Sequence, residues 1–184
     1  MTSTQTEPTR RQLLMPLLLI AGLVILDQIT KALIVAHVAR IEFGGPIIEV
    51  FGDVVRVIHV RNLGIAFSIG RDWAPLVRRI AFVVLPLFVV AGLGYYYVTS
   101  RELTGFQRWA LAAIIAGGAG NLIDRIFRPD GVVDWIDVKF YGILGMDRWP
   151  TFNVADASVV VGGILLVLGV IIESRSAAVG SDGA

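Results

Sequence analysis

The chain has 184 residues, of which 55% are hydrophobic and only 17% are charged, and its mean hydropathy is +0.74. Soluble domains carry about 25% charged residues, so this composition excludes an ordinary soluble enzyme and predicts an integral membrane protein. The chain has no cysteine, which excludes disulfides, thiol catalysis and cysteine-ligated metals, and its two histidines are too few for most histidine metal sites. The formal net charge of +1 predicts no nucleic-acid partner.

Four apolar segments are long enough to cross a bilayer, which takes about 20 residues in a helix. We expect transmembrane helices at 12–38, 75–98, 106–126 and 154–173. Pro16 and Pro86 fall inside two of these segments, and membrane helices tolerate proline better than soluble helices do. The predicted fold is therefore a mainly α membrane protein, built as a bundle of four transmembrane helices.

The long connection between the first two helices differs in character from the rest of the chain. Residues 47–60 are rich in β-branched side chains and are interrupted by glycine, which is typical of short strands. We expect a small β region at 41–72 and an irregular loop at 127–152. The predicted boundaries are a tail at 1–11, one membrane-embedded domain at 12–173 and a small, polar, disordered tail at 174–184.

Most of the unusual polar residues fall on one side of the membrane. Because the helices alternate in direction, the end of the first, the loop after it, the end of the third and the start of the fourth all share that side. Ionisable groups at membrane depth are costly and are therefore candidates for a functional site. The candidates on this side are Asp27, Lys31, Asn62, Asn121, Asp124, Arg125, Asp134, Asn153 and Asp156.

Asp134 and Asp156 are the most suggestive of these acids. Asp134 lies in an apolar stretch, where a lone carboxylate is expensive, and Asp156 lies at the start of the fourth helix. Two carboxylates at one membrane surface can share a proton and so supply a general base and a general acid. Independent helix caps in contact with water fit the same spacing, and Asp130, Asp137 and Asp147 are competing acids.

The other charged candidates also have structural interpretations. Asp27 and Lys31 are four residues apart in the favourable order for a helical ion pair, which suits a helix end as well as a substrate site. Asn121, Asp124 and Arg125 share one helix face and can equally well join two helices through polar contacts.

The sequence lacks the motifs of several other chemistries. It contains no His-Glu-x-x-His zinc motif, no nucleophile elbow, no phosphate-binding loop and no dinucleotide fingerprint. Two classes other than an enzyme with a catalytic pair of acids remain: a small ion channel or proton-coupled transporter using Asp27, Lys31 and Asp134, and a non-catalytic membrane scaffold. The second and fourth spans carry no ionisable group in their interiors, which disfavours the channel or transporter.

Five short blocks, in order along the chain, resemble the lipoprotein signal peptidase (signal peptidase II) family. They are Asp-Gln-Ile-Thr-Lys at 27–31, Asn-Leu-Gly-Ile-Ala-Phe-Ser at 62–68, Gly-Asn-Leu-Ile-Asp-Arg at 120–125, Val-Val-Asp at 132–134 and Phe-Asn-Val-Ala-Asp at 152–156. Each block is short, but five of them on the expected elements make a specific signal.

The resemblance implies four transmembrane helices with a small β-cradle on the extracytoplasmic face. It implies an aspartic endopeptidase that removes signal peptides from bacterial prolipoproteins, cutting before the diacylglyceryl-modified cysteine. Asp134 and Asp156 match the catalytic pair, which would activate water without a metal or other cofactor.

The remaining site residues are also assigned by the resemblance. Those that would hold the substrate backbone and brace the catalytic pair are Asn62, Gly64, Asn121, Arg125 and Asn153. Asp27 and Lys31 would form a supporting pair beside the site. Asp124 would have a structural role, pairing near Arg125.

The resemblance further implies a monomeric, multi-pass protein of the bacterial inner membrane, with its active site near the extracytoplasmic surface. Its partners would be diacylglyceryl-prolipoproteins, membrane lipids and cyclic peptide inhibitors of the globomycin type. A count of all Arg and Lys residues disfavours the implied cytoplasmic N-terminus. Arg10 and Arg11 directly precede the first helix, where positive charge weighs most, so we retain that orientation.

Overall fold

A computed structural model gives the arrangement of the chain and describes residues 9–64, 70 and 72–181. The helices are α1 (Arg10–His37), α2 (Pro75–Arg79), α3 (Leu85–Thr99), α4 (Gly105–Phe127) and α5 (Val154–Ser181), and a π-helical turn, η3 (Ile80–Val84), joins α2 to α3. Among the described residues, four helical segments are long and apolar enough to cross a membrane: α1, the continuous α2–η3–α3 segment, α4 and α5. The predicted four-helix membrane fold is confirmed.

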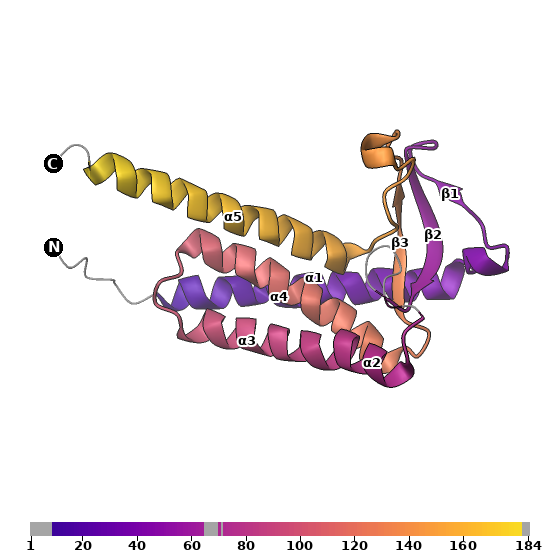
Figure 1. The fold of residues 1–184 in the computed structure, drawn as a ribbon, viewed down its shortest axis with the longest axis horizontal. Coiled ribbons are helices and arrows are strands. Elements are labelled where there is room, and N and C mark those ends of the chain that lie inside the picture. The colour runs from indigo at the N-terminus through magenta and orange to yellow at the C-terminus, as the bar shows by residue number, and fades with distance from the viewer. Residues whose placement is uncertain (1–8, 65–69, 71, 182–184) are drawn as a thin grey trace.

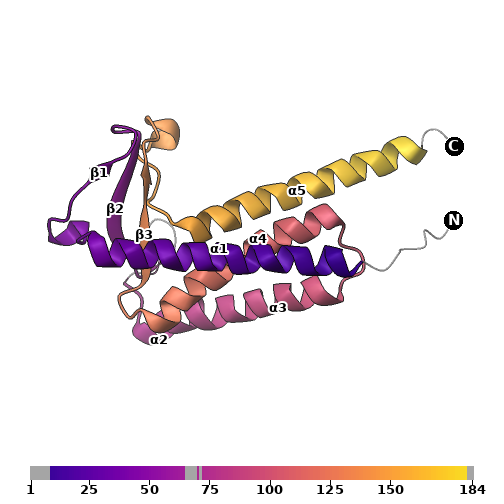
Figure 2. The ribbon, with the colours of Figure 1, turned by 180° about the vertical axis from the view of Figure 1, so that it is seen from behind.

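Helix α4 forms the centre of the bundle. It packs against α5, α1 and α3, and Figures 1 and 2 show these three helices arranged around it. Most of its span is buried within the protein, whereas the other three spans expose most of their apolar surface. Glycine allows the closest approach: a Cβ at Gly117 would lie 2.2 Å from the backbone oxygen of Ala155 on α5. Small residues at such contacts are typical of packed membrane helices.

A small antiparallel sheet lies at one end of the bundle, and its strands run across the helix direction (Figure 1). Its strands are β1 (Ile48–Glu49), β2 (Val55–Asn62) and β3 (Val132–Val138), in the order β1-β2-β3. Two 3-10 turns flank the sheet, η1 (Ile41–Phe43) and η4 (Ile143–Gly145). The start of α1 and the end of α5 lie at the opposite end of the bundle (Figure 1).

Strand β3 differs from the prediction, because its residues fall in the segment 127–152 that we expected to be irregular. The local sequence Val-Val-Asp-Trp-Ile-Asp-Val places two acids inside a short apolar run, so its alternation is poor. Pairing with β2, which sets Val60 opposite Asp134 and Asn62 opposite Val132, makes it a strand. That partner lies about 70 residues earlier in the chain, so no local pattern predicts it.

One helix boundary and one helix interior also differ from a regular helix at the expected bounds. The polar tail was expected to be disordered from residue 174, but α5 continues to Ser181, because no proline interrupts this segment. The second span contains the π-helical turn η3 directly before Pro86. Proline has no N–H for the carbonyl of Phe82, one helical turn earlier, and this loss favours a local change of hydrogen-bond pattern.

An ion-pair network fastens the connection after β3 to the sheet. Asp137 Oδ1 lies 2.8 Å from Arg148 Nε, and Asp137 Oδ2 lies 2.7 Å from Arg56 NH2. Asp53 lies 2.6 Å from Lys139 Nζ and 3.1 Å from Arg148 NH1. We refer to these five residues as the outer network. They join the start of β2 and the end of β3 to the connections beside these strands.

Candidate active site

Asp134 and Asp156 line one cavity of about 280 Å³ at the junction of the sheet and the bundle. Asp134 is on β3 and only 2% exposed, and Asp156 is in the first turn of α5. Asn153 caps this helix: its Oδ1 accepts from the N–H of Asp156 at 2.9 Å, and its own N–H donates to Asp156 Oδ2 at 3.2 Å. Asp156 is thus part of a helix cap, as one interpretation of the sequence allowed, and also faces the cavity.

Three asparagine side chains hold the two carboxylates. Asn62 Nδ2 donates to Asp134 Oδ2 at 3.0 Å, and Asn153 Nδ2 donates to Asp134 Oδ1 at 2.8 Å. Asn121 Nδ2 donates to Asp156 Oδ1 at 2.7 Å. These donors are uncharged, so they orient the carboxylates without supplying the full positive charge that would keep both acids ionised.

Burial, together with the negative charge of the nearby Asp156, raises the pKa of Asp134 to about 7, although the hydrogen bonds from Asn62 and Asn153 oppose the shift. A carboxylate in an apolar site loses hydration that neutral donors replace only in part. Asp134 is therefore able to hold a proton near neutral pH. This is the property that a carboxylic acid needs in order to act as a proton donor.

Lys31 is fully buried and contacts three of the polar residues that surround the two acids. Its Nζ lies 2.8 Å from Asp27 and 3.1 Å from Asp124, and it donates to Asn121 Oδ1 at 3.0 Å. Because an ammonium can only donate, this contact requires the carbonyl oxygen of Asn121 to face Lys31. Its amide nitrogen is thereby directed toward Asp156.

Asp27 and Asp124 also anchor the backbone beside each candidate catalytic acid. Asp27 Oδ1 accepts from the N–H of Ala155 at 3.0 Å, and Asp124 Oδ2 accepts from the N–H of Val133 at 3.1 Å. Ala155 precedes Asp156, and Val133 precedes Asp134. The buried lysine network therefore fixes the positions from which both acids project.

The expected pairing of Asp124 near Arg125 is wrong. Asp124 binds Lys31, Val133 and the guanidinium of Arg128, whereas Arg125 NH2 donates to the backbone oxygen of Gly64 at 3.2 Å. Successive residues of a helix point in directions about 100° apart, so two neighbours rarely share a partner. Arg125 instead lies at the edge of the cavity.

The structure gives a role to three positions for which the sequence predicted none. Gln28 Nε2 donates to Asp27, Asp124 and the backbone oxygen of Gly120, each at 3.1 Å. A Cβ at Gly120 would lie 2.7 Å from Asp27 Oδ2. Gly131 has φ +93°, and a Cβ there would lie 2.4 Å from the backbone oxygen of Asn62. Residue type alone gave no chemical signal for Gln28 or for the glycines.

Gly64 completes the set of predicted residues that the structure brings together. Its N–H donates to Asn62 Oδ1 at 3.0 Å, so the amide nitrogen of Asn62 is turned toward Asp134. Residues 65–68, the remainder of that sequence block, lie outside the described residues. Within the described part of the chain, no three His, Asp or Glu side chains are grouped to hold a metal ion.

Sequence comparison identifies the family. The model of the family Signal peptidase (SPase) II matches residues 19–172. The chain belongs to the signal peptidase II family. This confirms the resemblance seen in the five sequence blocks, and the chain is a member of a family of membrane proteases.

Similar curated proteins are bacterial lipoprotein signal peptidases. The one from Treponema denticola is 47% identical, with 86% of this chain and 90% of the relative covered. The one from Treponema pallidum is 44% identical, with 84% and 82% covered. The one from Borreliella burgdorferi is also 44% identical, with 81% and 85% covered.

Two solved structures, each described as a bacterial membrane enzyme, have the same fold as this signal peptidase II. One superposes with a TM-score of 0.73 at 27% identity, covering 88% of this chain and 90% of the other. The second has a TM-score of 0.69 at 29% identity, covering 85% and 92%. The arrangement of four helices and a small sheet is therefore that of known membrane enzymes.

Proposed function

We propose that this signal peptidase II removes signal peptides from bacterial prolipoproteins, cutting before the diacylglyceryl-modified cysteine, with Asp134 and Asp156 as its catalytic pair. The observation that carries the assignment is that both carboxylates line one cavity and are held by asparagine amides. Family membership and the names of the relatives support the substrate class. No observation favours the channel or transporter.

The chemistry follows from one proton shared by two acids. The ionised carboxylate removes a proton from water, and the water oxygen attacks the carbonyl carbon of the scissile peptide bond. The protonated acid, which we assign to Asp134 because its pKa is raised to about 7, donates its proton to the leaving nitrogen. The C–N bond breaks, leaving a carboxyl group on the signal peptide and an amine on the cysteine. No acyl-enzyme and no metal take part.

The polar residues around the pair divide into two roles. Asn62, Asn121 and Asn153 already donate to the acids and so position them. Arg125 lines the cavity and donates to the backbone oxygen of Gly64, and we place the backbone of the substrate beside these two residues. In this proposal Asp27, Lys31 and Asp124 support the site without touching the substrate.

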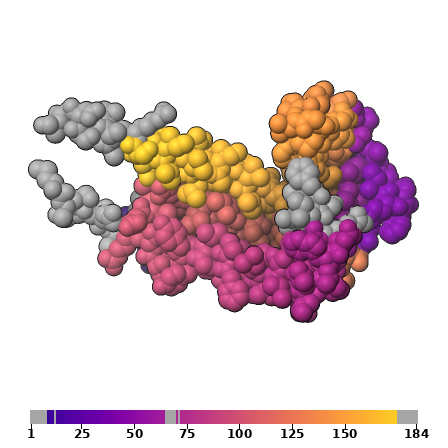
Figure 3. All heavy atoms as spheres, in the orientation of Figure 1, coloured from indigo at the N-terminus to yellow at the C-terminus, as the bar shows by residue number. Residues whose placement is uncertain are grey.

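The cavity opens toward the bilayer. Figure 3 shows the surface hollowed between α5 and the segment that follows β3. Val160 on α5 lines the cavity and is 58% exposed, and residues 149–152 line the other side. A substrate anchored by a diacylglyceryl group diffuses in the plane of the bilayer, so a lateral opening of this kind suits it.

The remaining parts of the proposal concern location and partners. We place the protein in the bacterial inner membrane as a monomer, with residues 12–173 as one domain, the N-terminus in the cytoplasm and the sheet on the extracytoplasmic side. Its partners are diacylglyceryl-prolipoproteins and membrane lipids. Cyclic peptides of the globomycin type would inhibit it by occupying the same cavity.

The test is cleavage of a purified diacylglyceryl-prolipoprotein, followed by gel shift. Asp134→Asn and Asp156→Asn should each lower the rate by about 10³-fold or more, since each removes a proton-transfer group. Asp137→Asn is the matched control, because Asp137 is on the same strand and only 3% exposed but belongs to the outer network. It should retain activity. Turnover at the wild-type rate in either of the first two variants would refute the catalytic pair.

A further inference from the structure

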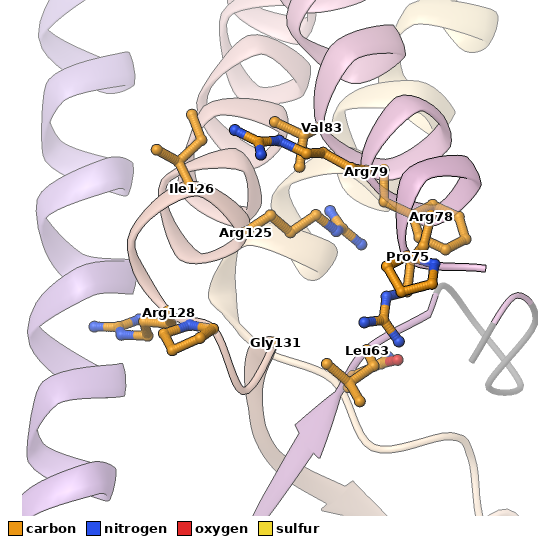
Figure 4. A pocket seen from close by; sticks show the side chains of 12 residues that line it. Leu63, Pro75, Arg78, Arg79, Val83, Arg125, Ile126, Arg128 and Gly131 are labelled. Atoms are coloured by element: carbon orange, nitrogen blue, oxygen red, sulfur yellow. The ribbon is translucent and has the colours of Figure 1, made fainter. Parts of the chain in front are cut away.

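A second cavity, of about 390 Å³, adjoins the active-site cavity and shares Asn62 and Arg125 with it. Four arginines line it, Arg78 and Arg79 from α2 and Arg125 and Arg128 from the end of α4. Figure 4 shows this space between the two helices, with Leu63 across from them. We refer to it as the arginine cavity.

Positive charge dominates the walls of the arginine cavity. Its charged lining residues are the four arginines, and no Asp or Glu of the described chain lines it. Arg128 pairs with Asp124, which is buried behind the cavity wall and is also bound by Lys31. Arg125 contacts neutral groups, the backbone oxygen of Gly64 and the ring of Phe82. A concave surface with one sign of charge attracts ligands of the other sign.

Helix stability does not explain the arginines of α2. Arg78 and Arg79 lie near the start of the continuous helical segment Pro75–Thr99. A helix has a partial positive charge at this end, so acidic residues are favoured there and basic residues are not. The two positive charges therefore serve something other than the stability of this helix.

The depth and the apolar edge of the cavity indicate what that ligand is. Pro75 begins one membrane span and Phe127 ends another, so the arginines lie at the level where the bilayer meets water. Val83 and Ile126 continue the lining toward the bundle, and Ile126 is 50% exposed. Cationic side chains next to exposed apolar side chains match a phosphate group with acyl chains attached. Arginine suits this role because its planar guanidinium binds phosphate oxygens through two donors.

We propose that the arginine cavity binds the phosphate group of an anionic glycerophospholipid, whose acyl chains lie along Val83 and Ile126. The arginine cavity shares Asn62 and Arg125 with the active-site cavity, but Arg78 and Arg79 line only the arginine cavity, and lipid binding there does not depend on the catalytic assignment. Each arginine offers charge-assisted hydrogen bonds to the phosphate oxygens, so the loss of Arg78 and Arg79 together should weaken lipid binding by about thirtyfold.

The experiment measures lipid retention by the full-length protein in detergent, by native mass spectrometry. The probes are phosphatidylglycerol and phosphatidylcholine with identical acyl chains. Wild type should retain phosphatidylglycerol in preference, and Arg78→Gln/Arg79→Gln should lose that preference. Arg10→Gln/Arg11→Gln is the matched control: it also removes two adjacent arginines, which are exposed at the opposite end of the bundle. It should bind like wild type.

A second arm separates the lipid from the phosphate group alone. Inorganic phosphate is titrated against bound phosphatidylglycerol, with chloride at the same ionic strength as the reference. The proposal requires that phosphate displace the lipid only at much higher concentration, because the acyl chains add affinity.

Three results would overturn the proposal: unchanged retention in Arg78→Gln/Arg79→Gln, equal losses in both double variants, or equal retention of the two lipids by wild type. Thermal unfolding of each variant distinguishes lost binding from lost folding. If Arg78→Gln/Arg79→Gln does not fold, the single variant Arg79→Gln, whose side chain is exposed, replaces it and should lower the preference about fivefold.

Discussion

The two groups of acids at the sheet end of the molecule are held in opposite ways. In the outer network, Asp53 and Asp137 are bound by arginine and lysine side chains. In the candidate active site, Asp134 and Asp156 are bound by asparagine amides. One acid of each group, Asp137 and Asp134, lies on the same strand, β3, so the difference lies in the partners and not in the strand.

The different partners shift the pKa values of Asp53 and Asp134 in opposite directions. The hydrogen bond from Lys139, together with neighbouring positive charges, holds the pKa of Asp53 below its usual value. Burial, with the charge of Asp156, raises the pKa of Asp134 to about 7. An acid with charged partners therefore stays ionised and forms a structural contact, whereas a buried acid with neutral partners can hold and donate a proton.

The buried lysine should give the largest effect on stability. Lys31→Met removes the charge that compensates Asp27 and Asp124, and breaking one side of a buried pair costs about 3–5 kcal/mol. Lys139→Met breaks an ion pair at the surface and should change the free energy of unfolding little. Unfolding in mixed micelles measures both. Equal losses would remove the distinction between the two networks.

The close packing around Asp27 should give the next largest effect. A methyl group at Gly120 would displace the carboxylate of Asp27 and press on Ala155, so Gly120→Ala should destabilise by about 1–3 kcal/mol. It should also lower activity, because Ala155 precedes Asp156. Gly163→Ala is the control, since nothing lies within 4 Å of the added methyl group. If both variants unfold at the wild-type midpoint, the packing argument fails.

The asparagine partners can be tested through the pH dependence of cleavage. Asn62→Ala removes a hydrogen bond that favours the ionised form of Asp134, so the pKa of Asp134 should rise further. The rate should fall about tenfold, and the loss of activity on the alkaline side should move to higher pH. Glu49→Ala, on the same sheet, should leave both unchanged. A lower rate with an unmoved alkaline limit would make Asn62 a packing residue only.

The smallest expected effect is that replacing the two acids changes the free energy of unfolding in opposite directions at pH 8. Because the pKa of Asp134 is raised in the folded protein, its ionisation lowers the free energy of unfolding as the pH rises from about 4 to 7. Asp134→Asn should therefore stabilise the protein by on the order of 1 kcal/mol more at pH 8 than at pH 5. With its pKa lowered, Asp53 contributes stability above its unfolded pKa, so Asp53→Asn should be destabilising at pH 8. Thermal unfolding at the two pH values gives both signs. The same sign for both variants would contradict the comparison.

Local patterns in the sequence were enough for the bundle and for the grouping of its polar residues. Each span is a mainly apolar segment of bilayer length, and alternation of four helices places Asp27, Asn121, Asp134 and Asp156 at one end. Both are properties of neighbouring residues and chain direction. The five sequence blocks added the family, which the comparisons confirmed.

The tertiary structure decided which side chains and strands contact one another. Lys31 binds Asp124 and Asn121, about 90 residues further along the chain, and β3 becomes a strand only against β2. The family resemblance implied that Asp124 pairs near Arg125, and the fold supplied Lys31 and Arg128 as its partners instead. Apolar length and helix periodicity are read from consecutive residues. The partners of a buried carboxylate depend on which backbones approach one another, and only the folded chain fixes this.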